Sequence, residues 1–89
     1  MKEKPVSEKK NLDSRDNCTL VLINDDLNTF EHVIKSLVEV CGHDPVQAEQ
    51  CAVITHFRGS CEVKSGSGKI INSMHIGLLD RNLSSEIKH

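Results

Sequence analysis

The residues best suited to chemistry form a short polar triplet, Asn24-Asp25-Asp26, directly after an apolar run. Polar side chains at the end of a buried strand lie beside an apolar interior, where ligand sites often form. Two carboxylates could act as acid and base, oxygen ligands could hold a divalent cation, and oxygen acceptors could bind an ammonium group. On the triplet alone, a solvated turn that leads into a helix is the more common arrangement.

Two of these kinds of chemistry fit the spacing poorly. Neighbouring residues rarely direct both carboxylates at one atom, and no third group stands at a catalytic spacing from the triplet. The alternating acidic ligands of a calcium loop are missing. Oxygen acceptors beside an apolar hollow would suit a ligand with one positive end and one apolar side chain. His56 is a second candidate acceptor, because a neutral imidazole can accept one hydrogen bond, although a lone His is more often an edge residue.

The four Cys residues form no metal or disulfide motif. They stand at positions 18, 41, 51 and 61, so there is no CxxC pair, and no two of the five His residues share a helical turn. Structural zinc sites normally use closely spaced ligand pairs. Each Cys falls at an apolar position of an expected helix or strand, without the Gly-rich turn or partner His of a nucleophile. We therefore expect four buried free thiols, no metal site and no catalytic Cys.

Length and charge exclude several classes of protein. The chain has 89 residues and a net charge of -2, whereas a nucleic-acid-binding protein needs a clear excess of Lys and Arg. No apolar run approaches the roughly 20 residues of a membrane span, and the charged start lacks the apolar stretch of a signal peptide. We therefore expect a cytoplasmic protein that binds neither nucleic acid nor membranes.

The composition divides the chain into two parts. Nine of the first 17 residues are charged and few are apolar, so residues 1–17 are expected to form a disordered, flexible N-terminal extension. Residues 18–89 then form a single folded core.

The polar triplet follows residues 18–23, a β-branched apolar run typical of a central strand. The next helix is expected to begin at Asn28 as N-cap, paired with Glu31 as in a capping box, and to end at Gly42. Its inward residues recur at helical spacing: Phe30, Val33, Ile34, Leu37, Val38 and Cys41.

A second helix carries His56. Its expected N-cap is Asp44, with Pro45 at the first helical position, and Gly59 ends it. Its inward residues are small, which permits close helix approach or leaves room for a pocket: Ala48, Cys51, Ala52 and Thr55.

The remaining chain is expected to begin with a strand at 60–64, in which Cys61 and Val63 point inward. A turn follows at 65–68, and Ser67 in this turn caps a third helix at 69–81. The inward residues of that helix are Ile70, Ile71, Met74, Leu78 and Leu79. Asn82 is expected to be left-handed, and the last strand alternates through Leu83, Ser85 and Ile87. The order predicts an α+β fold: a β-α-α-β-α-β sandwich, with a three-stranded antiparallel sheet packed against three helices.

The sequence closely resembles the signature of the ClpS family over essentially all of residues 18–89. The resemblance rests on the polar triplet after an apolar strand, followed about 30 residues later by a His before a Gly turn. The matching segments are Leu22-Ile23-Asn24-Asp25-Asp26, Asn28-Thr29-Phe30-Glu31-His32-Val33, Gly42-His43-Asp44-Pro45, Ala48, His56-Phe57-Arg58-Gly59-Ser60-Cys61 and Asn82-Leu83.

The resemblance implies an adaptor with no catalytic step and no cofactor. Such adaptors bind proteins through a free, bulky hydrophobic N-terminal residue (Phe, Leu, Trp or Tyr) and deliver them to a Clp AAA+ ATPase–protease. The partner would be a ClpA- or ClpC-type ATPase, and the adaptor would be a monomer. The charged extension, Met1 to Asn17, would engage the ATPase pore, and Lys69 lies where the family docks on the ATPase.

The resemblance also assigns site residues. Asn24, Asp25 and His56 would contact the substrate α-amino group, and Asp26 would support the loop or contact the first peptide unit. The side-chain pocket would be lined by Leu22, Asn28, Phe30, Val33, Ala52, Thr55 and Leu83.

Four of these positions depart from the family pattern. Phe30 stands where many members carry a Met gate, Ala52 and Thr55 replace a larger Met and an apolar β-branched residue, and Asn28 stands where Thr is common. The third helix also lacks acidic residues associated with ATPase docking. The alternative is an interaction domain like the C-terminal domain of the ribosomal stalk protein, without N-terminal residue recognition. A small hydrolase is the third function considered, and it fits least well because no nucleophile and base stand at the spacing of a known catalytic motif.

Overall fold

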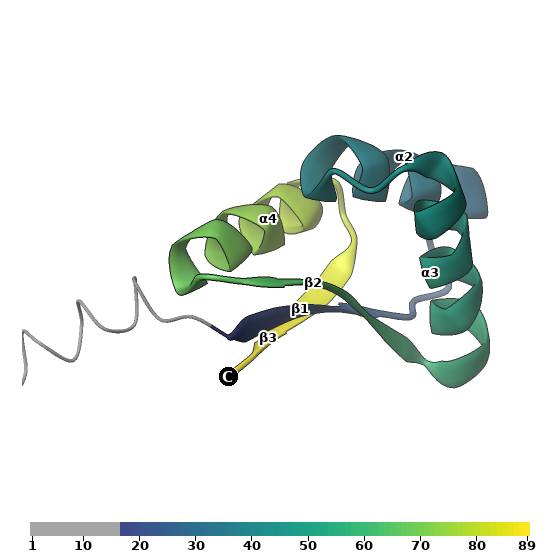
Figure 1. Cartoon of the computed structure of the whole chain (residues 1–89). Coiled ribbons are helices and arrows are strands. Elements are labelled where there is room, and N and C mark those ends of the chain that lie inside the picture. Colours follow the sequence, from purple (N-terminus) through teal and green to yellow (C-terminus); the bar gives the residue numbers. More distant parts are fainter. Residues whose placement is uncertain (1–16) are drawn as a thin grey trace, which may run out of the picture.

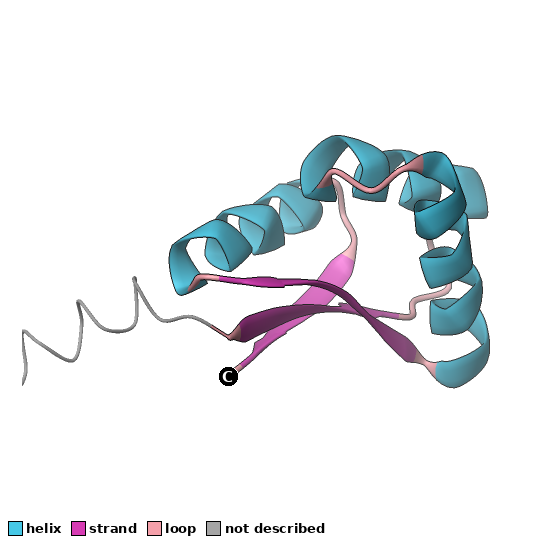
Figure 2. Ribbon diagram, in the orientation of Figure 1, coloured by secondary structure: helices cyan, strands magenta, loops and turns pink. Residues whose placement is uncertain are grey.

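The computed structural model describes residues 17–89, which form one sheet with helices on one of its faces (Figures 1 and 2). In chain order the elements are β1 (Cys18–Ile23), α2 (Phe30–Cys41), α3 (Pro45–Arg58), β2 (Ser60–Gly66), α4 (Gly68–Asp80) and β3 (Ser84–Lys88). The expected α+β order and the three-stranded antiparallel sheet are confirmed for this part of the chain. None of its helices is long and apolar enough to cross a membrane.

The apolar run at 18–23 is the middle strand of the sheet, as expected. The strand order is β2-β1-β3, and β1 pairs antiparallel with both neighbours. Strand β1 has a paired strand on each side, and its residues Cys18, Leu20, Val21 and Leu22 are all buried. Strand β2 continues two residues beyond the expected Lys64, because Ser65 and Gly66 pair with Thr19 and Cys18.

Helix ends follow the capping signals with one correction. Asp44 Oδ1 accepts a hydrogen bond from the Gln47 amide at 2.9 Å, and Gly42 and Gly59 end their helices with φ of 73° and 96°, where a Cβ would be strained. The N-cap of α2 is Thr29, whose Oγ1 accepts from the His32 amide, so the expectation of Asn28 was wrong. The Asn28 side chain is held elsewhere in the loop.

The core lies between the sheet and the helices. Its fully buried large side chains come from β1, α2 and α4: Leu20, Leu37, Ile71 and Leu78. The small inward face predicted for α3 is confirmed, since all four of its residues are buried.

The inward face of α4 was predicted only in part. The helix spans Gly68–Asp80, and Ile71 and Leu78 are buried, but Ile70 and Leu79 are 53% and 46% exposed. The helix is turned so that the line through Ile71, Met74 and Leu78 faces the sheet, which carries Ile70 and Leu79 outward. Asn82 has the expected left-handed conformation, with φ of 67°.

Candidate functional site

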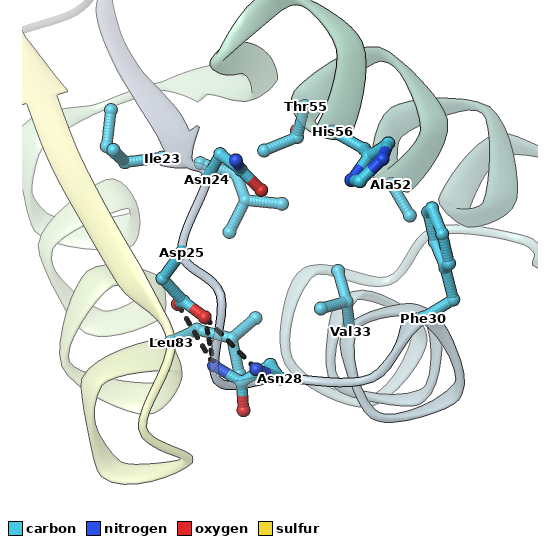
Figure 3. A pocket seen from close by; sticks show the side chains of 11 residues that line it. Ile23, Asn24, Asp25, Asn28, Phe30, Val33, Ala52, Thr55, His56 and Leu83 are labelled. Atoms are coloured by element: carbon cyan, nitrogen blue, oxygen red, sulfur yellow. Dashed lines mark hydrogen bonds between the residues drawn. The ribbon is translucent and has the colours of Figure 1, made fainter.

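A hollow opens where β1 ends, between the loop that follows it and helices α2 and α3 (Figure 3). Its volume is about 60 Å³. One water needs roughly 10–15 Å³ of such space, so the hollow is several times larger than a single water site. Its lining residues are Leu22, Ile23, Asn24, Asp25, Asn28, Phe30, Val33, Ala52, Thr55, His56 and Leu83.

The inner wall of the hollow is apolar. Leu22 comes from β1, Ala52 from α3 and Leu83 from the junction before β3, and each is at most 3% exposed. Thr55 offers no free hydrogen-bond donor, because its hydroxyl donates to the Cys51 carbonyl at 2.8 Å. The wall is therefore built from three segments that are far apart in the sequence, each fixed by burial in the core.

The loop after β1 is held by the carboxylate of Asp25. Its Oδ1 accepts hydrogen bonds from the main-chain amides of Leu27 (2.9 Å) and Asn28 (3.1 Å). The Asn28 side-chain Nδ2 contacts both carboxylate oxygens, at 3.1 and 3.0 Å, and also donates to the Asn82 carbonyl at 2.9 Å. Since a carboxylate has about four acceptor positions, Asp25 Oδ2 keeps capacity for a further donor.

Asn24 and His56 bring uncommitted polar groups to the hollow. The Asn24 main-chain amide donates to the Gly59 carbonyl at 2.9 Å, which ties the end of β1 to the turn after α3 and leaves the side-chain amide facing the hollow. Four of the five His rings have a hydrogen-bond partner within residues 17–89, and His56 is the exception. Its ring faces the hollow from the α3 side (Figure 3).

Two aromatic rings lie close to His56. The Phe30 ring lies 5.4 Å away at an interplanar angle of 59°, and the Phe57 ring lies 5.0 Å away, edge-on at 82°. Such contacts fix the imidazole plane without using its nitrogens. Phe30 is 46% exposed, so the first residue of α2 forms part of the mouth of the hollow rather than the core stripe that was expected.

The structure brings together ten of the twelve site residues named from the sequence. All seven expected pocket residues line the hollow, as do Asn24, Asp25 and His56. Asp26 is exposed and does not line it. Lys69 is exposed on the first turn of α4, whose start lies at the end of the molecule away from α3 (Figure 1).

Two residues beside the hollow were not predicted. Ile23 contributes to the lining, although its side chain points away in Figure 3, so no side-chain pattern could have identified it. Phe57 is 79% exposed and contacts His56 edge-on. An exposed Phe immediately after the candidate His, in a chain with only two Phe residues, was the available signal.

The cysteines are free, but not all are buried. Cys18, Cys41 and Cys51 are buried, whereas Cys61 is partly exposed on β2, so the expectation of four buried thiols was wrong for Cys61. Within residues 17–89, no three His, Cys, Asp or Glu side chains cluster as metal ligands would.

The chain was compared with protein families and with individual curated proteins. The family model described as ATP-dependent Clp protease adaptor protein ClpS matches residues 13–83, which is most of the chain. No individual curated protein matches it. The matched region contains β1, the polar loop, α2, α3 and every residue that lines the hollow. The chain therefore belongs to the ClpS family of Clp protease adaptors, which are adaptors and not proteases.

Proposed function

We propose that this adaptor binds its substrates through a free N-terminal α-amino group and the bulky hydrophobic side chain beside it. The observation that carries the proposal is the pairing of an apolar hollow with uncommitted acceptors on its rim. Within residues 17–89 the side chains of Asn24 and His56 make no hydrogen bond, and Asp25 is the only carboxylate among the lining residues. The ligand chemistry that this arrangement fits is one positive charge next to one apolar group.

An ammonium group needs such acceptors, because leaving water costs several kcal/mol unless hydrogen bonds replace its hydration. It has three donors after the peptide chain takes the fourth position on nitrogen. An oxygen of Asn24, Oδ2 of Asp25 and a nitrogen of His56 would supply three acceptors around it. A blocked α-amino group would have fewer donors and no charge, and would leave these acceptors unpaired.

The apolar wall would select the side chain. Burying a Phe or Leu side chain returns roughly 1.5–3 kcal/mol, whereas a small residue leaves the space empty and a charged one must be desolvated. The Phe30 side chain would narrow the mouth of the hollow, and the small side chain of Ala52 would leave more space inside it. We propose that the accepted class is Phe, Leu, Trp or Tyr.

We further propose that delivery uses other surfaces than recognition. Lys69 lies on α4 and outside the hollow, so an ATPase of the ClpA or ClpC type could dock there while the hollow holds a substrate. The charged extension, Met1 to Asn17, would engage the ATPase; all of it but Asn17 lies outside the described residues. In this proposal the adaptor is a cytoplasmic monomer.

Peptide binding tests the recognition proposal. Fluorescent peptides that begin with Phe or Leu should bind, and the same peptides with an acetylated N-terminus should not. Asp25→Ala should weaken binding more than tenfold, which corresponds to about 1.4 kcal/mol. His56→Ala should also weaken it, and this exposed side chain makes no hydrogen bond within residues 17–89, so the variant should fold normally.

A matched control separates the site from a general charge effect. Asp80→Ala makes the same type of substitution at an exposed position on α4, outside the hollow. It should leave peptide affinity unchanged. Anisotropy titrations of the four proteins with free and acetylated peptides give all the comparisons. Equal affinity for the free and acetylated peptides would refute recognition of the α-amino group.

A further inference from the structure

Two cysteine thiols lie against each other at the boundary between α3 and β2. The Sγ atoms of Cys51 and Cys61 are 2.8 Å apart, although the residues are ten positions apart in the chain. We propose that Cys51 and Cys61 are a redox-active pair that forms a reversible intramolecular disulfide. The proposal does not depend on how the adaptor recognises its substrates.

One of the two thiols is accessible to an oxidant in solution and the other is buried behind it, which suits an oxidation in two steps. Cys61 is partly exposed and lines a second, separate depression in the surface, together with Arg58 and Ile54. Cys51 is only 4% exposed and lies behind it in the core. An oxidant in solution would therefore meet Cys61 first, and Cys51 would be positioned to react second.

The other two cysteines are placed differently. Cys18 is fully buried, and its sulfur contacts His89 Nδ1 at 3.5 Å. Cys41 is 1% exposed at the end of α2. Within residues 17–89, Cys51 and Cys61 are the one pair of cysteines whose sulfur atoms are in hydrogen-bond contact. These two thiols should therefore pair selectively.

The oxidation balances with a small-molecule disulfide such as oxidised glutathione as oxidant. The Cys61 thiolate, its proton lost to water, attacks one glutathione sulfur and releases the other glutathione as a thiolate. Cys51, having lost its proton to water, then attacks the Cys61 sulfur and releases the second glutathione. Two protein thiols are oxidised, and one glutathione disulfide is reduced to two glutathione molecules. A dithiol reductant reverses both exchanges.

The second exchange should limit the rate. Burial, followed by the hydrogen bond with Cys61, raises the pKa of the Cys51 thiol well above its usual range. Because the thiolate is the attacking species, disulfide closure should accelerate as the pH rises.

The disulfide would join two walls of the binding hollow. Cys51 precedes Ala52 and accepts a hydrogen bond from Thr55, both of which line the hollow. Cys61 pairs in the sheet with Leu22, which forms the opposite wall. The bond would thus link α3 covalently to the sheet next to the site.

Peptide mapping tests the proposal on the full chain. The protein is equilibrated with excess oxidised glutathione, its remaining thiols are alkylated under denaturing conditions, and it is digested with trypsin. Trypsin cuts after Arg58, between the two cysteines, so the disulfide should appear as peptide 36–58 joined to peptide 59–64. The intact protein should lose two hydrogen atoms in mass and regain them with dithiothreitol.

Two variants make the assignment unambiguous, because peptide 36–58 also contains Cys41. Cys41→Ala should keep the joined peptides, and Cys51→Ser should abolish them and leave Cys61 carrying glutathione. The proposal is overturned if wild-type Cys51 and Cys61 are recovered alkylated, if Cys61 stays as the glutathione mixed disulfide, or if the joined peptides come from a covalent dimer.

Discussion

At the residue scale, the side chain of Asn28 connects two segments around the site, the loop after β1 and the turn before β3. Its amide nitrogen donates to the carboxylate of Asp25, in the same loop, and to the carbonyl of Asn82, at the start of the turn into β3. Leu83, the next residue, forms part of the apolar wall. Asn28 thus fixes both the direction of the Asp25 carboxylate and the position of the wall opposite it, which a shorter Thr side chain would not reach in the same way.

The thiol of Cys41 gives a prediction for stability against pH. Burial raises the pKa of this thiol from 9.0 to about 11, so the folded protein holds the proton more tightly than the unfolded chain does. The stabilisation is complete below pH 9 and is lost as the pH rises toward 11. The free energy of unfolding, measured by denaturant titration below pH 9 and near pH 11, should therefore fall over this interval.

The control for this prediction is Cys41→Ala. The variant loses the contribution of this thiol, so its free energy of unfolding should fall less steeply between the same two pH values. Part of the fall should remain, since burial raises the pKa of Cys51 as well. Identical slopes for the wild type and the variant would contradict the assignment to Cys41.

The sequence predicted most of the polar residues that line the hollow, but it did not predict the hydrogen bonds among them. Polar residues after an apolar strand and a His before a Gly turn identified Asn24, Asp25 and His56, all of which line the hollow. The same pattern could not show that Asp26, beside Asp25, faces solvent, because adjacent side chains in a loop follow no fixed period. Nor could it show that Asn28 bridges to Asn82, which is a contact across 54 residues.

At the element scale, helix ends were easier to predict than helix faces. Caps depend on one or two residues, and Asp44, Gly42 and Gly59 act as their types predict. The face that a helix buries depends on how its neighbours approach. In α4, Gly77 lies so close to α2 that a Cβ there would be 2.9 Å from Val40 Cγ1. That close approach favours the observed rotation of α4, and apolar spacing alone did not reveal it.

This contact predicts a coupled pair of substitutions. Gly77→Ala should lower the free energy of unfolding by about 1 kcal/mol, because an overpacking cost of roughly 1–3 kcal/mol exceeds a helix-propensity gain of about 1 kcal/mol. When Val40→Ala is already present, the obstruction is gone and only the propensity gain remains. Gly77→Ala should then stabilise the protein. Denaturant titrations of the four proteins in the cycle measure this change of sign.

Gly66→Ala is the matched control for the glycine substitution. A Cβ at Gly66 would meet Ile71 Cδ1 at 4.0 Å, which is ordinary contact, so little change in stability is expected. If Gly77→Ala destabilised the protein equally with and without Val40, the loss would come from somewhere other than this helix contact.

At the scale of the whole molecule, the fold followed from the order of the elements. An apolar central strand, short connections and three helical patterns leave few ways to cover one face of a small sheet. The hollow depends on finer properties, namely the small residues of α3 and the position of Leu83. Helical spacing identified the small inward residues of α3, whereas Leu83 was assigned to the pocket only through the resemblance to a family.

The proposed division of labour between extension and core gives the last prediction. A protein that begins at Asn17, after an initiating Met, keeps every residue that lines the hollow. It should bind a Phe-initiated peptide with the affinity of the full chain and should fail to support degradation of a Phe-initiated protein by the Clp ATPase–protease. Anisotropy and a degradation assay on the same preparations compare the two activities. A loss of peptide affinity on truncation would show that the extension takes part in recognition.

The central place of β1 in the sheet also makes folding depend on contacts between distant parts of the chain. The first strand of the described chain pairs with two strands that come after long intervening segments: Thr19 meets Ser65 on one side and Lys88 on the other. Closing such long loops costs chain entropy before any strand pairing compensates for it, so topologies of this kind fold more slowly than helical ones of equal length. The hollow needs Leu22 from β1 and Leu83 from the approach to β3. The complete hollow should therefore require both long-range pairings of β1, including the one across the longest loop.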